Sequence, residues 1–107
     1  MKYKVNLTSS AEEDLFEIYK YIYFNDSESI ADKVYSGLKQ KCHTLQEFAE
    51  RGHTPKELLL FGINDFQEII YSTYRIIYQI IGKEVFIYSV LDSRRDLQRI
   101  LLEKLIR

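Results

Sequence analysis

The chain has 107 residues, of which 46% are hydrophobic and 29% charged, and its formal net charge is −1. That length predicts one domain, residues 1–107, built on a single core, and the composition excludes a disordered protein. No apolar run approaches the roughly 20 residues that span a bilayer, and no signal-peptide pattern opens the chain. We therefore expect a cytoplasmic protein without a membrane partner.

Charge is distributed unevenly along the chain. Residues 1–50 have a net charge of −3 and residues 51–107 a net charge of +2. A protein that binds a nucleic-acid backbone usually carries a basic stripe. The only candidate patch is C-terminal and is diluted by acids; its basic members are Arg94, Arg95, Arg99, Lys104 and Arg107. We therefore expect no direct, specific DNA binding by the chain alone.

The N-terminal half predicts a strand and two helices. Residues 2–7 alternate between apolar and polar side chains, which is typical of a half-buried strand. Ser9 and Ser10 each stand three residues before a glutamate, a capping-box spacing that predicts a helix running to about Phe24. After a polar turn, Asp26 or Ser27 can cap a second helix, whose apolar stripe continues to Phe48.

The C-terminal half predicts a loop, three strands and a helix. Apolar side chains in the loop 51–65 are expected to pack on the core; they are Leu58, Leu59, Leu60, Phe61 and Ile63. Residues 66–71, 73–81 and 84–91 predict consecutive antiparallel strands, and 96–106 a closing helix. The fold class is therefore α+β, in the order β-α-α-β-β-β-α, with a helical hairpin packed on an antiparallel sheet. The place of the first strand, at an edge or between later strands, stays open.

Few residues suggest a cofactor or a metal. Cys42 falls on the apolar face of the second helix and is interpreted as a small buried hydrophobe. His43 and His53 have no metal-ligand spacing to other residues, so we interpret them as solvent-exposed. No cofactor and no metal site are expected. By contrast, aromatics surround the first helix in numbers that one core face cannot use, which favours a protein partner.

Three arginines are candidates for binding. Arg75 lies inside a predicted strand, where it either points outward and pairs with a cross-strand acid such as Glu68 or Glu84, or holds a phosphate or a partner carboxylate in its planar fork. Arg94 and Arg95 stand at a strand end just before a helix. A loop in that position presents side chains on a rigid frame, which favours a contact role.

Several segments together resemble one family. They are Thr8 to Ile22, with its Ser-Ser-Ala-Glu-Glu-Asp-Leu start, the Glu57-Leu58 and Gly62-Ile63 pairs, the Tyr-Arg-Ile-Ile-Tyr run 74–78, and Arg94-Arg95-Asp96-Leu97. In this order they are similar to the ParE branch of the RelE/ParE superfamily of toxin–antitoxin toxins, which includes plasmid stabilisation proteins. The chain departs from the common pattern at Gln67, where an arginine is usual, and at Asp92-Ser93, where His-Gly is usual.

The resemblance implies a toxin that a cognate antitoxin neutralises, with two alternative activities. A RelE-type toxin is a ribosome-dependent mRNA endoribonuclease, and in this chain the resemblance would place Arg75 and Arg95 at its catalytic site, with Glu68 or His53. Lysines of that branch correspond to Phe66 and Glu68 here, however. A ParE-type toxin instead poisons DNA gyrase by binding it and needs no catalytic residue.

The favoured interpretation is a ParE-like gyrase inhibitor, leaning away from an enzyme. The expected target-binding residues are Arg94, Arg95, Arg99 and Arg75, and the expected antitoxin-binding residues are Tyr19, Tyr23 and Phe24. The alternatives are the ribosomal endoribonuclease, with ribosome and mRNA as partners, and an inactive homologue that only binds its antitoxin.

Overall fold

A computed structural model describes residues 2–105 and confirms the α+β class. The elements in chain order are β1 (Lys4–Leu7), α1 (Ser9–Asn25), α2 (Glu28–His43), α3 (Leu45–Phe48), the 3-10 turn η1 (Ala49–Arg51), α4 (Lys56–Leu59), β2 (Gln67–Tyr71), β3 (Tyr74–Ile81), β4 (Glu84–Asp92) and α5 (Leu97–Leu105). Ile106 and Arg107, which the sequence places in the last helix and the basic patch, lie outside the described residues.

The sheet has the strand order β1-β4-β3-β2. The strands β2, β3 and β4 are antiparallel neighbours, as expected. The strand β1 is an edge strand that pairs with β4 in parallel, Lys4 lying opposite Glu84 and Leu7 opposite Ile87. The expectation of an antiparallel sheet is therefore wrong at β1, and the sheet is mixed. Parallel pairing needs a long crossover, which the helices and strands between β1 and β4 provide.

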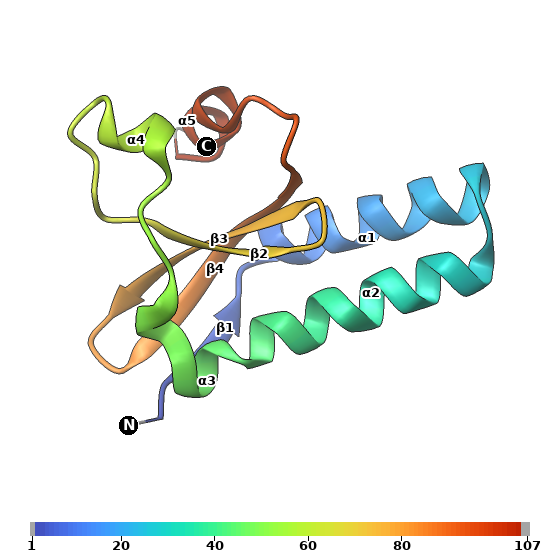
Figure 1. Cartoon of the computed structure of the whole chain (residues 1–107), viewed down its shortest axis with the longest axis horizontal. Coiled ribbons are helices and arrows are strands. Elements are labelled where there is room, and N and C mark those ends of the chain that lie inside the picture. The colour runs from blue at the N-terminus through green and yellow to red at the C-terminus, as the bar shows by residue number, and fades with distance from the viewer. Residues whose placement is uncertain (1, 106–107) are drawn as a thin grey trace.

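Two layers of helices enclose the sheet (Figure 1). The hairpin of α1 and α2 packs on one face, over buried residues that include Ile76, Tyr78 and Ile87. The short α4 and the C-terminal α5 lie on the other side, over a second cluster that includes Ile77, Leu91 and Leu97.

A β-bulge in β4 determines which residues of this strand lie on each face of the sheet. Tyr78 pairs with Ile87 and Ile77 pairs with Ser89, so Tyr88 is an extra residue in β4. One extra residue reverses the alternation of side chains between the faces. As a result Ile87 packs under the hairpin, whereas Leu91, four residues later, packs under α5.

The helix boundaries differ from the expectation in two places. The cap of α1 is Thr8 rather than Ser9 or Ser10: its Oγ1 accepts from the Ala11 N–H at 3.2 Å. Thr8 is fixed there because its N–H donates to the Ile87 carbonyl of β4 at 3.1 Å. The expected cap Ser27 is confirmed at α2, where its Oγ accepts from the Ile30 N–H at 3.1 Å.

The second helix also ends earlier than its apolar stripe predicts. Thr44 interrupts it, donating its hydroxyl to the Lys41 carbonyl at 2.6 Å, and the separate turn α3 follows. The Gln46 carbonyl of α3 accepts from the Tyr3 N–H at 2.7 Å. Pairing with the chain just before β1 thus competes with continuation of the helix.

The expectation that the loop after Pro55 packs its apolar residues on the core is wrong except at Leu58. That residue is buried, whereas Leu59, Leu60, Phe61 and Ile63 are exposed. The chain turns back directly after α4, with Gly62 at a φ of 72° and the Ile63 N–H bonded to the Leu58 carbonyl at 2.9 Å. One helical turn can direct only one of these side chains toward the sheet.

Candidate functional site

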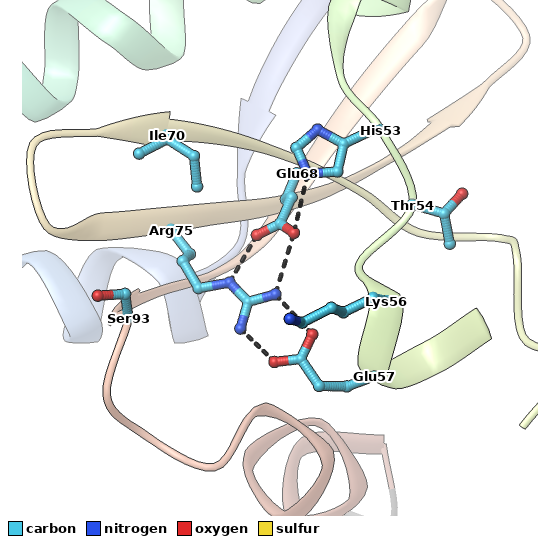
Figure 2. Close-up of a pocket in the computed structure, with 8 residues that line it drawn as sticks. All are labelled: His53, Thr54, Lys56, Glu57, Glu68, Ile70, Arg75 and Ser93. Atoms are coloured by element: carbon cyan, nitrogen blue, oxygen red, sulfur yellow. Dashed lines mark hydrogen bonds and ion pairs between the residues drawn. The ribbon is translucent and has the colours of Figure 1, made fainter. Parts of the chain in front are cut away.

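Arg75 is the centre of a buried ion cluster on the sheet face opposite the helical hairpin (Figure 2). Its residue exposure is 7%. Its Nε and Nη2 donate to the Glu68 carboxylate at 2.6 and 3.0 Å. Its Nη1 and Nη2 donate to the Glu57 carboxylate at 2.5 and 2.9 Å. Two carboxylates of the chain itself therefore occupy both sides of the guanidinium fork.

Three elements bring the cluster together. Arg75 on β3 pairs with Ile70 of β2, which puts Glu68 two residues away on the same face. Glu57 comes from α4, and the Gln98 amide of α5 donates to the Glu57 carbonyl at 2.9 Å. His53 forms a backbone bridge with Glu68, and its Nε2 lies 3.2 Å from the Glu68 carboxylate. A cavity of about 400 Å³ adjoins the cluster.

Hydrogen bonds within the cluster favour the charged forms of Glu57 and Arg75. Hydrogen bonds from Arg75 lower the pKa of Glu57 to about 2. Hydrogen bonds to Glu57 and Glu68 raise the pKa of Arg75 above its ordinary value. Neither Arg75 nor Glu57 changes its protonation state near neutral pH, so neither is suited to transfer a proton there.

The structure combines parts of the two interpretations of Arg75. The cross-strand partner Glu68 is one of the two acids that the sequence suggested, but the side chain is buried rather than solvent-facing. The second partner, Glu57, was missed. It lies 18 residues away in a loop helix, and no local spacing connects it to a strand.

The alternative catalytic residues do not meet at one place. Arg75, Glu68 and His53 line the 400 Å³ cavity. Arg95 lines other hollows of the surface, formed with α1 and α5. Phe66, at a position where the resemblance implies a lysine, is buried against Tyr88.

The other arginines expected to bind a target lie at the surface. Arg94 has a side chain that is 88% exposed and donates from its Nε and Nη2 to Asp92, each at 3.1 Å. These hydrogen bonds lower the pKa of Asp92. Arg95 is exposed, and Arg99 is exposed and pairs with Glu103 one turn along α5 at 3.2 Å. Three of the four expected target residues are thus accessible, whereas Arg75 is not.

The expected antitoxin residues lie on the helical hairpin. Phe24, near its tip, is 78% exposed, and Tyr23 packs against it at 5.1 Å between ring centroids. Tyr19 is half-buried and ties the two helices together, since its hydroxyl donates to Asp32 of α2 at 2.8 Å. This hydrogen bond raises the pKa of Tyr19 to about 12.

Other residues considered for chemistry have ordinary surroundings. Cys42 is buried, and burial raises the pKa of its thiol to about 11. His43 is exposed. Within residues 2–105, no cluster of His, Cys, Asp or Glu is suited to hold a metal ion, and no helix is long and apolar enough to cross a membrane.

Comparisons with known proteins identify one toxin family and a shared fold. The profile described as "ParE toxin of type II toxin-antitoxin system, parDE" matches residues 5–97. The chromosomal ParDE system of P. aeruginosa contains a similar structure, with a TM-score of 0.70 and 17% identity over 85% of this chain and 96% of that chain. No curated protein sequence matches the chain.

Two further solved structures share the fold. The toxin–antitoxin complex RelBE2 of Mycobacterium tuberculosis has a TM-score of 0.64 and 19% identity over 86% of this chain and 99% of that chain. A mutant of the E. coli toxin RelE in the free state also has a TM-score of 0.64, with 20% identity over 100% of this chain and 98% of that chain.

Proposed function

We propose that this chain, which belongs to the ParE toxin family of type II toxin–antitoxin systems, arrests growth by binding DNA gyrase and trapping its cleaved-DNA state. It acts in the cytoplasm as a single toxin domain and is neutralised by a cognate antitoxin. One contrast supports gyrase binding over catalysis. The Arg75 guanidinium is already bound by Glu57 and Glu68, whereas the arginines that follow β4 are exposed.

A phosphodiester cleavage site requires a cation that is free to hold the phosphate. Here Glu57 and Glu68 occupy Arg75, so a phosphate entering the cavity would have to displace a bidentate carboxylate. The two acids outnumber the one buried cation, so the cluster itself disfavours an anion. These contacts support a toxin that works through a binding surface.

The antitoxin is proposed to cover the helical hairpin. Tyr23 and Phe24 expose large aromatic surface, and Tyr19 supports it from the interhelical side. A partner segment that folds on binding can wrap such a surface. Tyrosine and phenylalanine supply much contact area at a low cost in side-chain entropy.

Expression of the chain without antitoxin tests the target. We expect growth arrest in which DNA-damage signalling rises before bulk translation falls, and purified protein should inhibit supercoiling by gyrase. Rapid translation arrest with cuts in mRNA at the ribosomal A site would overturn the proposal in favour of the endoribonuclease. Antitoxin binding without any growth arrest would indicate an inactive homologue.

A further inference from the structure

A groove of about 610 Å³ lies between α1 and the connection from β4 to α5. Its apolar lining includes buried Ile22 and Leu91 and half-buried Ile18. Tyr21 of α1, which is 70% exposed, and Tyr74 at the start of β3 line it as well. The groove therefore offers an apolar surface with two tyrosine side chains.

The groove also contains three carboxylates, and each already has a cationic partner. Asp14 pairs with Lys104 at 2.6 Å, Glu17 with Lys20 at 3.0 Å, and Asp92 with Arg94 at 3.1 Å.

Arg95 lines the same groove, and no ion pair connects its guanidinium to any acid among residues 2–105. The Arg95 guanidinium therefore leaves one local positive charge for an incoming group. A single carboxylate can pair with it.

We propose that this groove receives a segment of the toxin's protein target that carries an apolar side chain next to a carboxylate. The apolar side chain packs against Tyr21 and Tyr74, and the carboxylate binds Arg95, with unused donors of Arg94 nearby. This inference rests on the proposed function. It adds two tyrosines to the target-binding arginines and defines the chemistry of the target segment.

A nucleic acid is a poorer occupant of the groove. A polyphosphate backbone would bring several negative charges, whereas Arg94 is already paired with Asp92 and Arg95 offers one cation, enough for a single anionic group.

Two of the three proposed antitoxin residues lie away from the groove. Residues two apart on a helix point in different directions, so Tyr19 and Tyr23 lie on another side of α1 than Tyr21, whereas Phe24, three residues after Tyr21, borders the groove side.

The test compares groove variants with matched controls. The groove variants are Tyr21→Ala and Arg95→Glu, together with Thr73→Trp, which fills the groove from an exposed position and removes no buried side chain. The controls are Phe61→Ala and Arg51→Glu, at exposed positions outside the groove. Each protein is checked by its melting temperature, produced without antitoxin to measure growth arrest, and titrated with purified gyrase holoenzyme and with purified antitoxin.

We expect each groove variant to remain folded, to bind gyrase at least about tenfold more weakly and to lose growth arrest, while both controls keep it. Antitoxin affinity should change less than about threefold in every variant. The loss with Arg95→Glu should be greatest at low salt, because screening weakens a surface charge contact.

Each contrary result has a distinct meaning. Folded groove variants that stay fully toxic or bind gyrase normally overturn the groove, while gyrase inhibition by the wild type still supports the proposed function. Loss of growth arrest in the groove variants of a toxin that does not bind gyrase supports the groove and refutes the gyrase target.

Three further results would overturn the groove assignment. Weakened antitoxin binding with toxicity retained assigns the groove to the antitoxin. Binding of duplex DNA alone that Arg95→Glu abolishes assigns it to nucleic acid. A wild-type chain that never arrests growth refutes both the groove and the proposed function.

Discussion

Replacing Arg75 with methionine should strongly destabilise the fold. The Glu68 side chain is 5% exposed, so removal of its guanidinium partner leaves a carboxylate that water cannot reach well, with the His53 Nε2 at 3.2 Å as its remaining ion-pair contact among residues 2–105. Breaking a buried ion pair by removing one partner costs about 3–5 kcal/mol. Glu57 adds less, because its side chain is 30% exposed and can turn toward solvent. We therefore expect a loss of about 3 kcal/mol, or more than about 10 °C in Tm.

Urea denaturation followed by circular dichroism at pH 7 measures this loss. The double variant Arg75→Met with Glu68→Met should recover most of it, because it leaves no unpaired buried charge. Arg94→Met is the matched control; its side chain is 88% exposed and it should change stability by less than about 0.5 kcal/mol. A loss below about 1 kcal/mol for Arg75→Met, or a double variant less stable than the single one, would refute the reasoning.

Three other predictions follow from the surface arginines, the hairpin aromatics and Glu57. Arg94→Ala combined with Arg95→Ala should abolish toxicity while changing stability by about 0.5 kcal/mol or less and leaving antitoxin affinity nearly unchanged; full toxicity would move the target surface elsewhere. Separate alanine substitutions of Tyr19, Tyr23 and Phe24 should weaken antitoxin binding in a calorimetric titration, and unchanged affinity in all three contradicts that placement. Because the pKa of Glu57 falls from 4.5 to about 2 on folding, its contribution is complete above pH 4.5 and is lost as the pH drops toward 2. Solvent screening reduces this contribution to about 1–2 kcal/mol, and acid denaturation of Glu57→Gln should show a correspondingly flatter dependence on pH.

Local patterns in the sequence predicted much of the fold. The apolar stripes of α1 and α2 and the alternation of β3 and β4 each depend on a short stretch of chain, and these elements form as predicted except that α2 ends at His43. The cap Ser27 depends on one turn of helix and was also predictable. The helix boundaries that depend on residues far away in the sequence were not predictable. Thr8 caps α1 because β4 fixes it, and Thr44 ends α2 where α3 turns to meet Tyr3.

The candidate site was harder to predict for the same reason. The cross-strand pair of Arg75 and Glu68 follows from strand order, and one of the two suggested acids is the partner. Glu57 reaches Arg75 only through the position of α4, which no periodicity determines. The bulge at Tyr88 likewise has no sequence signal, although it decides which β4 residues face α5. The type of side chain therefore indicated what Arg75 could bind. Only the tertiary structure shows that Glu57 and Glu68 already bind it.

The edge position of β1 has a consequence for how the toxin is made. Among residues 2–105 its strand partner is β4 alone, so Lys4 pairs with Glu84, which is made 80 positions later in the chain. Long-range parallel pairing is slow to form, because the intervening loop must close before any contact is gained. During synthesis the ribosome releases β1 long before β4, so the four-stranded sheet is completed only after Asp92, the last residue of β4, has emerged. The nascent chain thus cannot present the proposed target surface early, because Arg94 and Arg95 follow β4 in the chain.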